Sequence, residues 1–296
     1  MRSSHNKRSK FALWVVGALT WIYMFGSMAT AAGVSSKVTV NYNISFDGMQ
    51  IGSFIMHASV NNSQYSINAT ANISLLAGII FEWKGITSSS GRVVNKGPAP
   101  SSYSFGYRTS EKSEKVDVKF ADNSVREIAV NPPQRPSSGR VPVTRQHMQN
   151  VVDPLSALLL FSNFGHNQSG EEVCNHTLPI FDGKQRYDLQ LSYKRTKSVT
   201  ANGDDEEAGG RGYRGPAYVC KIKFVPISGH KAGDEENNYA AQSEGMEVWM
   251  IPVARSGLYV PYYIRIPTPV GVATLSSVGF RVSGLGVNHA VVEDSQ

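Results

Sequence analysis

The ten residues from Lys37 to Phe46 read KVTVNYNISF, and Asp47-Gly48 follows them directly. Every second residue of this segment is apolar or aromatic, and the residues between them are polar. Such alternation is typical of a β-strand with one buried face and one solvated face. The Asp-Gly pair is a strong signal for a two-residue hairpin turn. The segment therefore predicts an antiparallel hairpin near the start of the folded chain.

The same alternation recurs over most of the remaining sequence. Further strands are expected at 49–60, 65–73, 86–94, 102–109, 116–120, 178–181, 187–193, 218–224, 246–252, 259–266 and 270–276. No repeat of fixed period is visible. Roughly ten strands of this kind predict a mostly β protein, built as a single curved or spiral antiparallel sheet or an open barrel.

One helix is predicted, over residues 155–164. Asp153 is suited to the N-cap, Pro154 to the first helical position, and Gly165 to the stop. Its leucines follow helical spacing, which produces one apolar side. We expect this short helix to pack on the concave face of the sheet, against residues such as Val40, Tyr42 and Ile44. The alternative is an element that touches a membrane. The leucines on the apolar side are Leu155, Leu158 and Leu159.

The first 31 residues have the three parts of a secretory signal peptide. A basic start contains no acidic residue, an apolar run extends from Phe11 to Phe25, and Ala29-Thr30-Ala31 forms a small-residue cleavage site. The apolar run is shorter than the roughly 20 residues of a spanning helix. We expect cleavage after Ala31 and export to the periplasm. An uncleaved N-terminal anchor is the alternative, and it would be the only route to membrane association.

Residues 32–296 are predicted to form a single periplasmic β domain, with a core at about 37–280. Flexible loops are expected near 201–215, which is Gly-rich and acidic, and near 229–243. Of 29 basic residues, four lie in the first 31, which leaves 25 against 23 acidic residues and a net charge of +2. This near balance argues against nucleic acid as a partner, because phosphate binding needs a clustered basic surface.

Cys174 and Cys220 are the two cysteines of the chain. In an oxidising compartment an isolated pair is most simply one disulfide. Each cysteine is in phase with neighbouring apolar residues, so both are expected to point to the apolar side of adjacent strands. Two free buried thiols are the alternative. A metal site using Cys174 and His176 is disfavoured, and no metal is expected.

No motif for catalysis or for cofactor binding is found, so neither a cofactor nor an enzymatic activity is expected. Aromatic residues are the remaining feature. They are interpreted as core packing or, alternatively, as the lining of an apolar cavity beside the helix. The candidate cavity residues are Phe81, Trp83, Leu155, Leu158, Leu159, Trp249 and Tyr262.

Four segments occur in an order that resembles a bacterial exported family, domain of unknown function 3108. They read FDGMQIGSF at 46–54, DPLSAL at 153–158, IFDGKQRYDL at 180–189 and WMIPVAR at 249–255. The resemblance covers about 37–280. It implies a periplasmic, mostly β protein with no assigned chemistry, and it does not extend to the cysteine pair or the acidic insertions.

We therefore expect a non-enzymatic protein of the cell envelope that binds a lipid or a hydrophobic client and so supports envelope integrity. Two alternatives stay open. One is a structural scaffold for an envelope protein partner, and the other is a hydrolase or modifier of envelope polymers.

Overall fold

The computed structural model describes residues 35–61, 63–75, 81–94, 97–133, 139–161, 169–200, 208, 210–253 and 256–284. The chain divides into two compact units, Met1–Ala32 and Gly33–Gln296, and every described residue belongs to the second. The predicted signal peptide and most of the acidic loop near 201–215 lie outside the described residues. Among the described residues, no helix is both long enough and apolar enough to cross a bilayer.

The described strands join one antiparallel sheet. The first half consists of β1 (Ser36–Phe46), β2 (Met49–Val60), β3 (Gln64–Leu75), β4 (Phe81–Val94), β5 (Gly97–Thr109), β6 (Ser113–Ala121) and β7 (Ser124–Asn131). The second half consists of β8 (Leu160–Phe161), β9 (Thr177–Phe181), β10 (Arg186–Val199), β11 (Gly215–Ser228), β12 (Glu247–Val253), β13 (Leu258–Thr268) and β14 (Gly271–Gly284).

The strand order is β7-β6-β5-β4-β3-β2-β1-β14-β13-β12-β11-β10-β9, with β8 paired to β13. β7 and β9 end this order without pairing to each other, so the sheet does not close into a barrel. This arrangement confirms the predicted fold class, a mostly β protein with a single open antiparallel sheet. The β1–β2 turn is the predicted one, with Asp47 at φ 47° and Gly48 at φ 81°, the left-handed backbone that Asp-Gly turns use.

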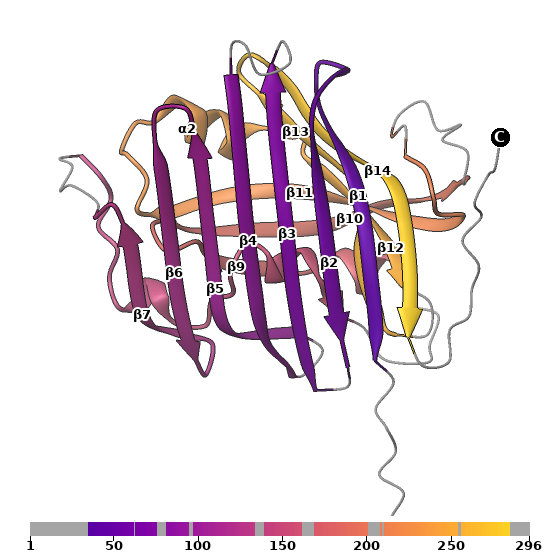
Figure 1. Cartoon of the computed structure of the whole chain (residues 1–296), viewed down its shortest axis with the longest axis horizontal. Coiled ribbons are helices and arrows are strands. Elements are labelled where there is room, and N and C mark those ends of the chain that lie inside the picture. The colour runs from indigo at the N-terminus through magenta and orange to yellow at the C-terminus, as the bar shows by residue number, and fades with distance from the viewer. Residues whose placement is uncertain are drawn as a thin grey trace, which may run out of the picture. The chain divides into compact units, whose positions relative to one another are not determined.

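The two halves of the sheet share one core. In Figure 1 the strands β10, β11 and β12 run across behind the strands of the first half. Val40 on β1, Val116 on β6 and Trp249 on β12 belong to the same buried cluster, which we call the main core. The turn between β9 and β10 lies against β6, where a Cβ on Gly183 would overlap the Val116 side chain.

The predicted helix over 155–164 is wrong over residues 155–161, and residues 162–164 lie outside the described residues. Residues Ser156–Leu158 form a single 3₁₀ turn (η2), and Leu160–Phe161 form β8, opposite Tyr259 and Leu258 of β13. A helix of about ten residues is marginal by itself, and pairing with β13 satisfies the backbone of β8 instead. The segment still packs where it was expected, because Leu155 and Leu159 are buried in the main core with Val40 and Tyr42.

Three further helical elements are present among the described residues. They are the 3₁₀ turn η1 (Gln146–Met148) and the α-helices α1 (Gly170–Cys174) and α2 (Glu235–Gln242). α1 begins with a capping box in which the Ser169 and Glu172 side chains each accept a backbone N–H. The prediction of a flexible loop over 229–243 is wrong for Glu235–Gln242, which form α2.

Cys174 and Cys220 form the expected disulfide. The predicted position of Cys174 on a strand is wrong, because this residue ends α1. The bond joins α1 to β11 within a second buried cluster, which we call the disulfide core, and which also contains Leu160, Val248 and Met250. A helix end can carry a buried cysteine as well as a strand can, so apolar phase alone did not identify the element.

Candidate functional site

The seven residues predicted to line one cavity lie in two separate groups. Leu155, Leu159, Trp249 and Tyr262 are buried in the main core, and Leu158 packs against it from a partly exposed position. Phe81 and Trp83 lie apart from these five, at the beginning of β4. The structure therefore does not bring the seven together around one space.

The first half of the sheet is buried at one end of its core face and partly exposed at the other. Val40, Met56 and Ile67 are fully buried on β1, β2 and β3. Further along the same face, apolar side chains of six neighbouring strands remain partly exposed. We call this set the open strip, and it consists of Leu275, Ile44, Phe54, Ile73, Trp83 and Tyr107.

Strand register shows that the open strip is continuous. Leu275 on β14 is opposite Ile44 on β1, and Ile44 is opposite Gly52 on β2. Gly52 is opposite Ile73, and Ile73 is opposite Trp83 on β4. Phe54 and Tyr107 lie in the adjoining row, which runs through Ala71 and Gly85. Because directly opposed residues point to the same face of a sheet, these side chains form one surface.

Trp83 is the largest side chain of the open strip. Its ring stacks on Tyr107 with centroids 6.0 Å apart and an interplanar angle of 18°, and Phe105 lies 6.4 Å away. A Cβ at Gly85 would overlap the indole, so glycine at this position lets the ring lie across β4. Phe81 extends the aromatic surface and is 40% exposed.

The two ends of the open strip differ in chemistry. Beyond Leu275 the register continues to Ile264 on β13 and Val248 on β12, which pack with the disulfide core beneath α1 and α2. Beyond Tyr107 the register continues to Glu114 on β6. Glu114 is ion-paired with Lys184 from the β9–β10 turn, and the Lys112 ammonium lies 5.9 Å from the centroid of the Tyr107 ring.

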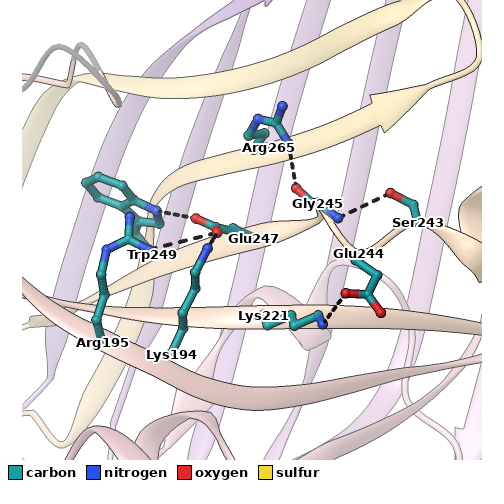
Figure 2. Close-up of polar contacts among 9 residues, drawn as sticks. All are labelled: Lys194, Arg195, Lys221, Ser243, Glu244, Gly245, Glu247, Trp249 and Arg265. Atoms are coloured by element: carbon teal, nitrogen blue, oxygen red, sulfur yellow. Dashed lines mark hydrogen bonds and ion pairs between the residues drawn. The ribbon is translucent and has the colours of Figure 1, made fainter.

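A charged cluster surrounds Trp249 on β12 and is drawn in Figure 2. The Glu247 side chain is only 8% exposed and is ion-paired with Lys194, with Arg195 Nη1 at 3.9 Å. The Trp249 indole N–H donates to Glu247 Oε2 at 3.4 Å. Arg195 and Lys197 lie over the indole at 5.6 and 4.7 Å from its centroid, within cation–π range.

This cluster connects strands that are not neighbours. Lys194 and Arg195 belong to β10 and Glu247 to β12, so the charges meet across β11. A buried carboxylate is tolerated when opposite charges and hydrogen bonds compensate it. The Trp249 ring therefore packs against an ion-pair network. It lies in a different part of the sheet from Trp83.

Asp153 is fully buried and organises the segment before η2. Its Oδ1 accepts the backbone N–H groups of Leu155 and Ser156 at 3.0 and 2.9 Å. Its Oδ2 accepts the Ser156 and Ser89 hydroxyls at 2.5 and 2.8 Å. Burial raises the pKa of Asp153, and the hydrogen bonds from Ser156 and Ser89 oppose that shift. Tyr65 completes the network with a 2.8 Å hydrogen bond to Ser156.

Asp182 has a similar role in the β9–β10 turn. Its Oδ1 accepts the backbone N–H groups of Lys184 and Gln185 at 2.8 and 2.6 Å. Burial raises the pKa of Asp182 as well. Asp153 and Asp182 are the acidic residues of the DPLSAL and FDGK segments. Both carboxylates hold turns of the backbone, which explains why an aspartate suits these positions.

Within the part of the chain that the structure describes, no group of three His, Cys, Asp or Glu side chains is arranged to hold a metal ion. A pocket of about 200 Å³ lies away from the open strip, near the β6–β7 turn, and is lined by Arg92, Ala99, Pro100, Ser101, Phe120, Ala121, Asp122 and Asn123.

Sequence reasoning missed most of the open strip. It selected Trp83 but not Ile44, Phe54, Ile73 or Leu275, which were assigned to strands as ordinary core residues. Alternation shows which face of a strand is apolar. It contains no signal for where along that face the covering segments stop.

Comparison with known proteins adds a family and two solved structures. A family model described as "Protein of unknown function (DUF3108)" matches residues 41–276. A beta-barrel-like protein of domain of unknown function DUF1849 from Brucella abortus has 9% identity and a TM-score of 0.46, over 84% of this chain and 98% of its own. A DUF1329 family protein from Desulfovibrio piger has 10% identity and a TM-score of 0.20, over 89% and 91%. No curated protein matches the chain.

Proposed function

The chain belongs to the DUF3108 family, and from this premise we propose that it is an exported, non-enzymatic protein of the bacterial cell envelope that binds the acyl chain of a lipid on the open strip. The observation that carries the proposal is the continuous, partly exposed apolar surface from Leu275 to Tyr107. Contiguous exposed apolar surface of this kind usually marks a binding site.

The dimensions of the open strip suit a chain-like ligand. It crosses β14, β1, β2, β3, β4 and β5. Five steps between neighbouring strands correspond to about 24 Å, since strands lie roughly 4.8 Å apart. Its six side chains are all partly buried, and the flanking Phe81 is more exposed, at 40%. The strip extends across six neighbouring strands, and this length suits an extended acyl chain.

Export is supported by the basic start, apolar run and A-x-A site of the first 31 residues. Binding without catalysis is supported by the use of the buried carboxylates. Asp153 and Asp182 accept hydrogen bonds from backbone turns, and Glu247 is occupied by Lys194 and Trp249. These acidic groups are committed to holding the fold.

Titration of the mature protein with a fluorescent fatty-acyl probe tests the proposal. Ile73→Ser removes an apolar side chain from the open strip and should weaken probe binding about tenfold, because it removes roughly 1.5 kcal/mol of apolar contact. Ile86→Ser is the matched control. Ile86 lies on the adjacent strand and is 65% exposed on the opposite face, so its replacement should leave binding unchanged.

Two results would count against lipid binding. The wild type could fail to take up the probe, or Ile73→Ser and Ile86→Ser could bind it equally well. In either case the scaffold for a protein partner would become the better explanation of the open strip.

A further inference from the structure

We propose that the protein docks on the surface of a lipid bilayer with one end of its sheet, and that acyl chains pass there between the bilayer and the open strip. The passage of acyl chains rests on the proposed function, whereas docking itself does not. We call this end of the sheet the rim. It consists of the β1–β2 turn, the β13–β14 turn and the beginning of β4, and its exposed apolar residues are Met49, Phe81, Ile266 and Val270.

Strand pairing places the parts of the rim at the same end of the sheet. Phe46 on β1 is opposite both Met49 on β2 and Ala273 on β14. Phe81 begins β4 opposite the last residue of β3. In Figure 1 the indigo β1–β2 turn and the yellow β13–β14 turn both lie at the top. Of the nine large apolar side chains that are exposed among the described residues, four are at the rim, and the other five are scattered.

Hydrogen bonds hold the two turns of the rim together. The Asp47 backbone N–H donates to the Val272 carbonyl at 2.9 Å, and the Val272 N–H donates to Asp47 Oδ1 at 2.7 Å. The Thr268 hydroxyl donates to the Gly271 carbonyl at 2.9 Å across the β13–β14 turn. Val270 is nevertheless 80% exposed. The rim therefore presents apolar side chains to water from a backbone that is already fixed, as a docking surface requires.

The apolar face of the open strip continues to the rim without a polar interruption. Residues two positions apart on a strand point to the same face and lie about 7 Å apart. Three strands carry two successive apolar residues of this face toward the rim. These pairs are Ile44 and Phe46 on β1, Trp83 and Phe81 on β4, and Ile264 and Ile266 on β13. An acyl chain can therefore move from the rim to the open strip along apolar side chains.

The form and charge of the rim favour a bilayer as the partner. Met49 and Val270 stand on separate turns with polar backbone between them, and a fluid lipid surface accommodates such separate points of contact. Lys84 is ion-paired with Glu82 at 2.7 Å, and Asp47 adds a carboxylate. The described charges of the rim are therefore not predominantly basic. Insertion of apolar side chains, and not attraction to anionic headgroups, should supply the binding free energy.

Co-sedimentation of the mature protein with phosphatidylcholine vesicles tests docking. The wild type should bind, and its binding should change little with added salt or with added phosphatidylglycerol. Met49→Ser/Val270→Ser should weaken vesicle binding by about tenfold or more, because two apolar side chains lose their burial in the bilayer interface. Ile86→Ser/Val94→Ser is the matched control, because these side chains are 65% and 43% exposed away from the rim. It should bind vesicles like the wild type.

A second measurement separates docking from acyl binding. Met49→Ser/Val270→Ser should bind the fluorescent fatty-acyl probe normally in the absence of vesicles, because the open strip is unchanged. It should take up the probe from preloaded vesicles more slowly than the wild type. Ile73→Ser should behave in the opposite way, with normal vesicle binding and weaker probe binding. The unfolding midpoints of both double variants should match the wild type, since all four replaced side chains are exposed.

Each outcome has a distinct meaning. Docking is overturned if the wild type does not bind phosphatidylcholine vesicles, or if the two double variants bind them equally well; probe uptake would then leave the proposed function intact. Binding that needs phosphatidylglycerol and is released by salt would overturn it as well. A wild-type dimer that Met49→Ser/Val270→Ser converts to a monomer would assign the rim to a second copy of the chain and overturn docking on lipid. Vesicle binding without probe uptake would support docking and reject the proposed function.

Discussion

Asp153 offers the sharpest test of how the fold is held together. Asp153→Ala removes the acceptor of two buried backbone N–H groups, those of Leu155 and Ser156. The two serine hydroxyls lose less, because Ser89 and Ser156 already lie 2.8 Å apart and can pair with each other. A buried donor without a partner costs roughly 1–3 kcal/mol, so the free energy of unfolding should decrease by about 2–5 kcal/mol.

Asp153→Asn separates the charge from the shape of the side chain. Its amide oxygen can still accept both backbone N–H groups, so the expected loss at neutral pH is smaller, about 1–2 kcal/mol. The carboxyl also carries a pH signature. Burial raises its folded-state pKa above the ordinary value of 3.8. The folded protein therefore takes up a proton at pH values where the unfolded chain does not.

The sign of this linkage determines the expected pH dependence. The stabilisation from protonation is fully present below the unfolded pKa of 3.8 and is lost as the pH rises through the folded pKa of Asp153. The asparagine variant has no such titration. The free energy of unfolding of Asp153→Asn should therefore fall further below that of the wild type near pH 4 than near pH 7.

Urea unfolding of the two variants and the wild type at several pH values measures these differences, with an unchanged m-value as the check on two-state comparison. Asp122→Asn is a suitable control, because the Asp122 side chain is 85% exposed at a turn and should change stability by less than about 0.5 kcal/mol. The reasoning is refuted if Asp153→Ala is as stable as the wild type. A pH-independent deficit for Asp153→Asn would refute the assigned pKa direction.

Three further outcomes are expected. Replacing Cys174 and Cys220 together by serine should lower the free energy of unfolding by about 3–4 kcal/mol on the chain-entropy model, since the two residues are 46 positions apart. Thermal unfolding with and without reductant checks this prediction. An unchanged melting temperature of the wild type in reductant would contradict it. Leu159→Ala should cost about 2–5 kcal/mol of stability because this side chain is fully buried. Leu158→Ala should cost less, because Leu158 is partly exposed. Denaturant midpoints in the reverse order would be inconsistent with this packing. Intact-mass measurement of the exported protein should show cleavage after Ala31, and retention of the apolar run would instead indicate a membrane anchor.

Most of the fold follows from a pattern that is local in the chain. Alternation with a period of two residues places Val38, Val40 and Tyr42 on one face, and that face is the buried one. The Asp47-Gly48 turn follows from the backbone angles that these residue types adopt. The Cys174–Cys220 bond follows from the cysteine count and the predicted compartment. Each of these properties depends on near neighbours or on composition, so sequence was sufficient.

The segment after Asp153 shows where local reasoning ends. Its helical spacing and cap are real, but residues 160–161 pair with β13 because that strand offers unpaired backbone groups nearby. The intrinsic helix propensity of ten residues contributes only a small free energy. Pairing with β13 outweighs it. The meeting of Lys194 with Glu247 across β11 is likewise absent from any local pattern, since the two residues are 53 positions apart.

The open strip is the clearest case of a property decided by tertiary structure. Val40 and Ile44 have the same chemistry and the same phase on β1, yet the first is buried and the second is partly exposed. The difference arises because segments far away in the chain, including Leu155 and Leu159, cover one end of the face. Sequence determined which face of the sheet is apolar, and only the packing of distant segments determined which part of that face is left available for a ligand.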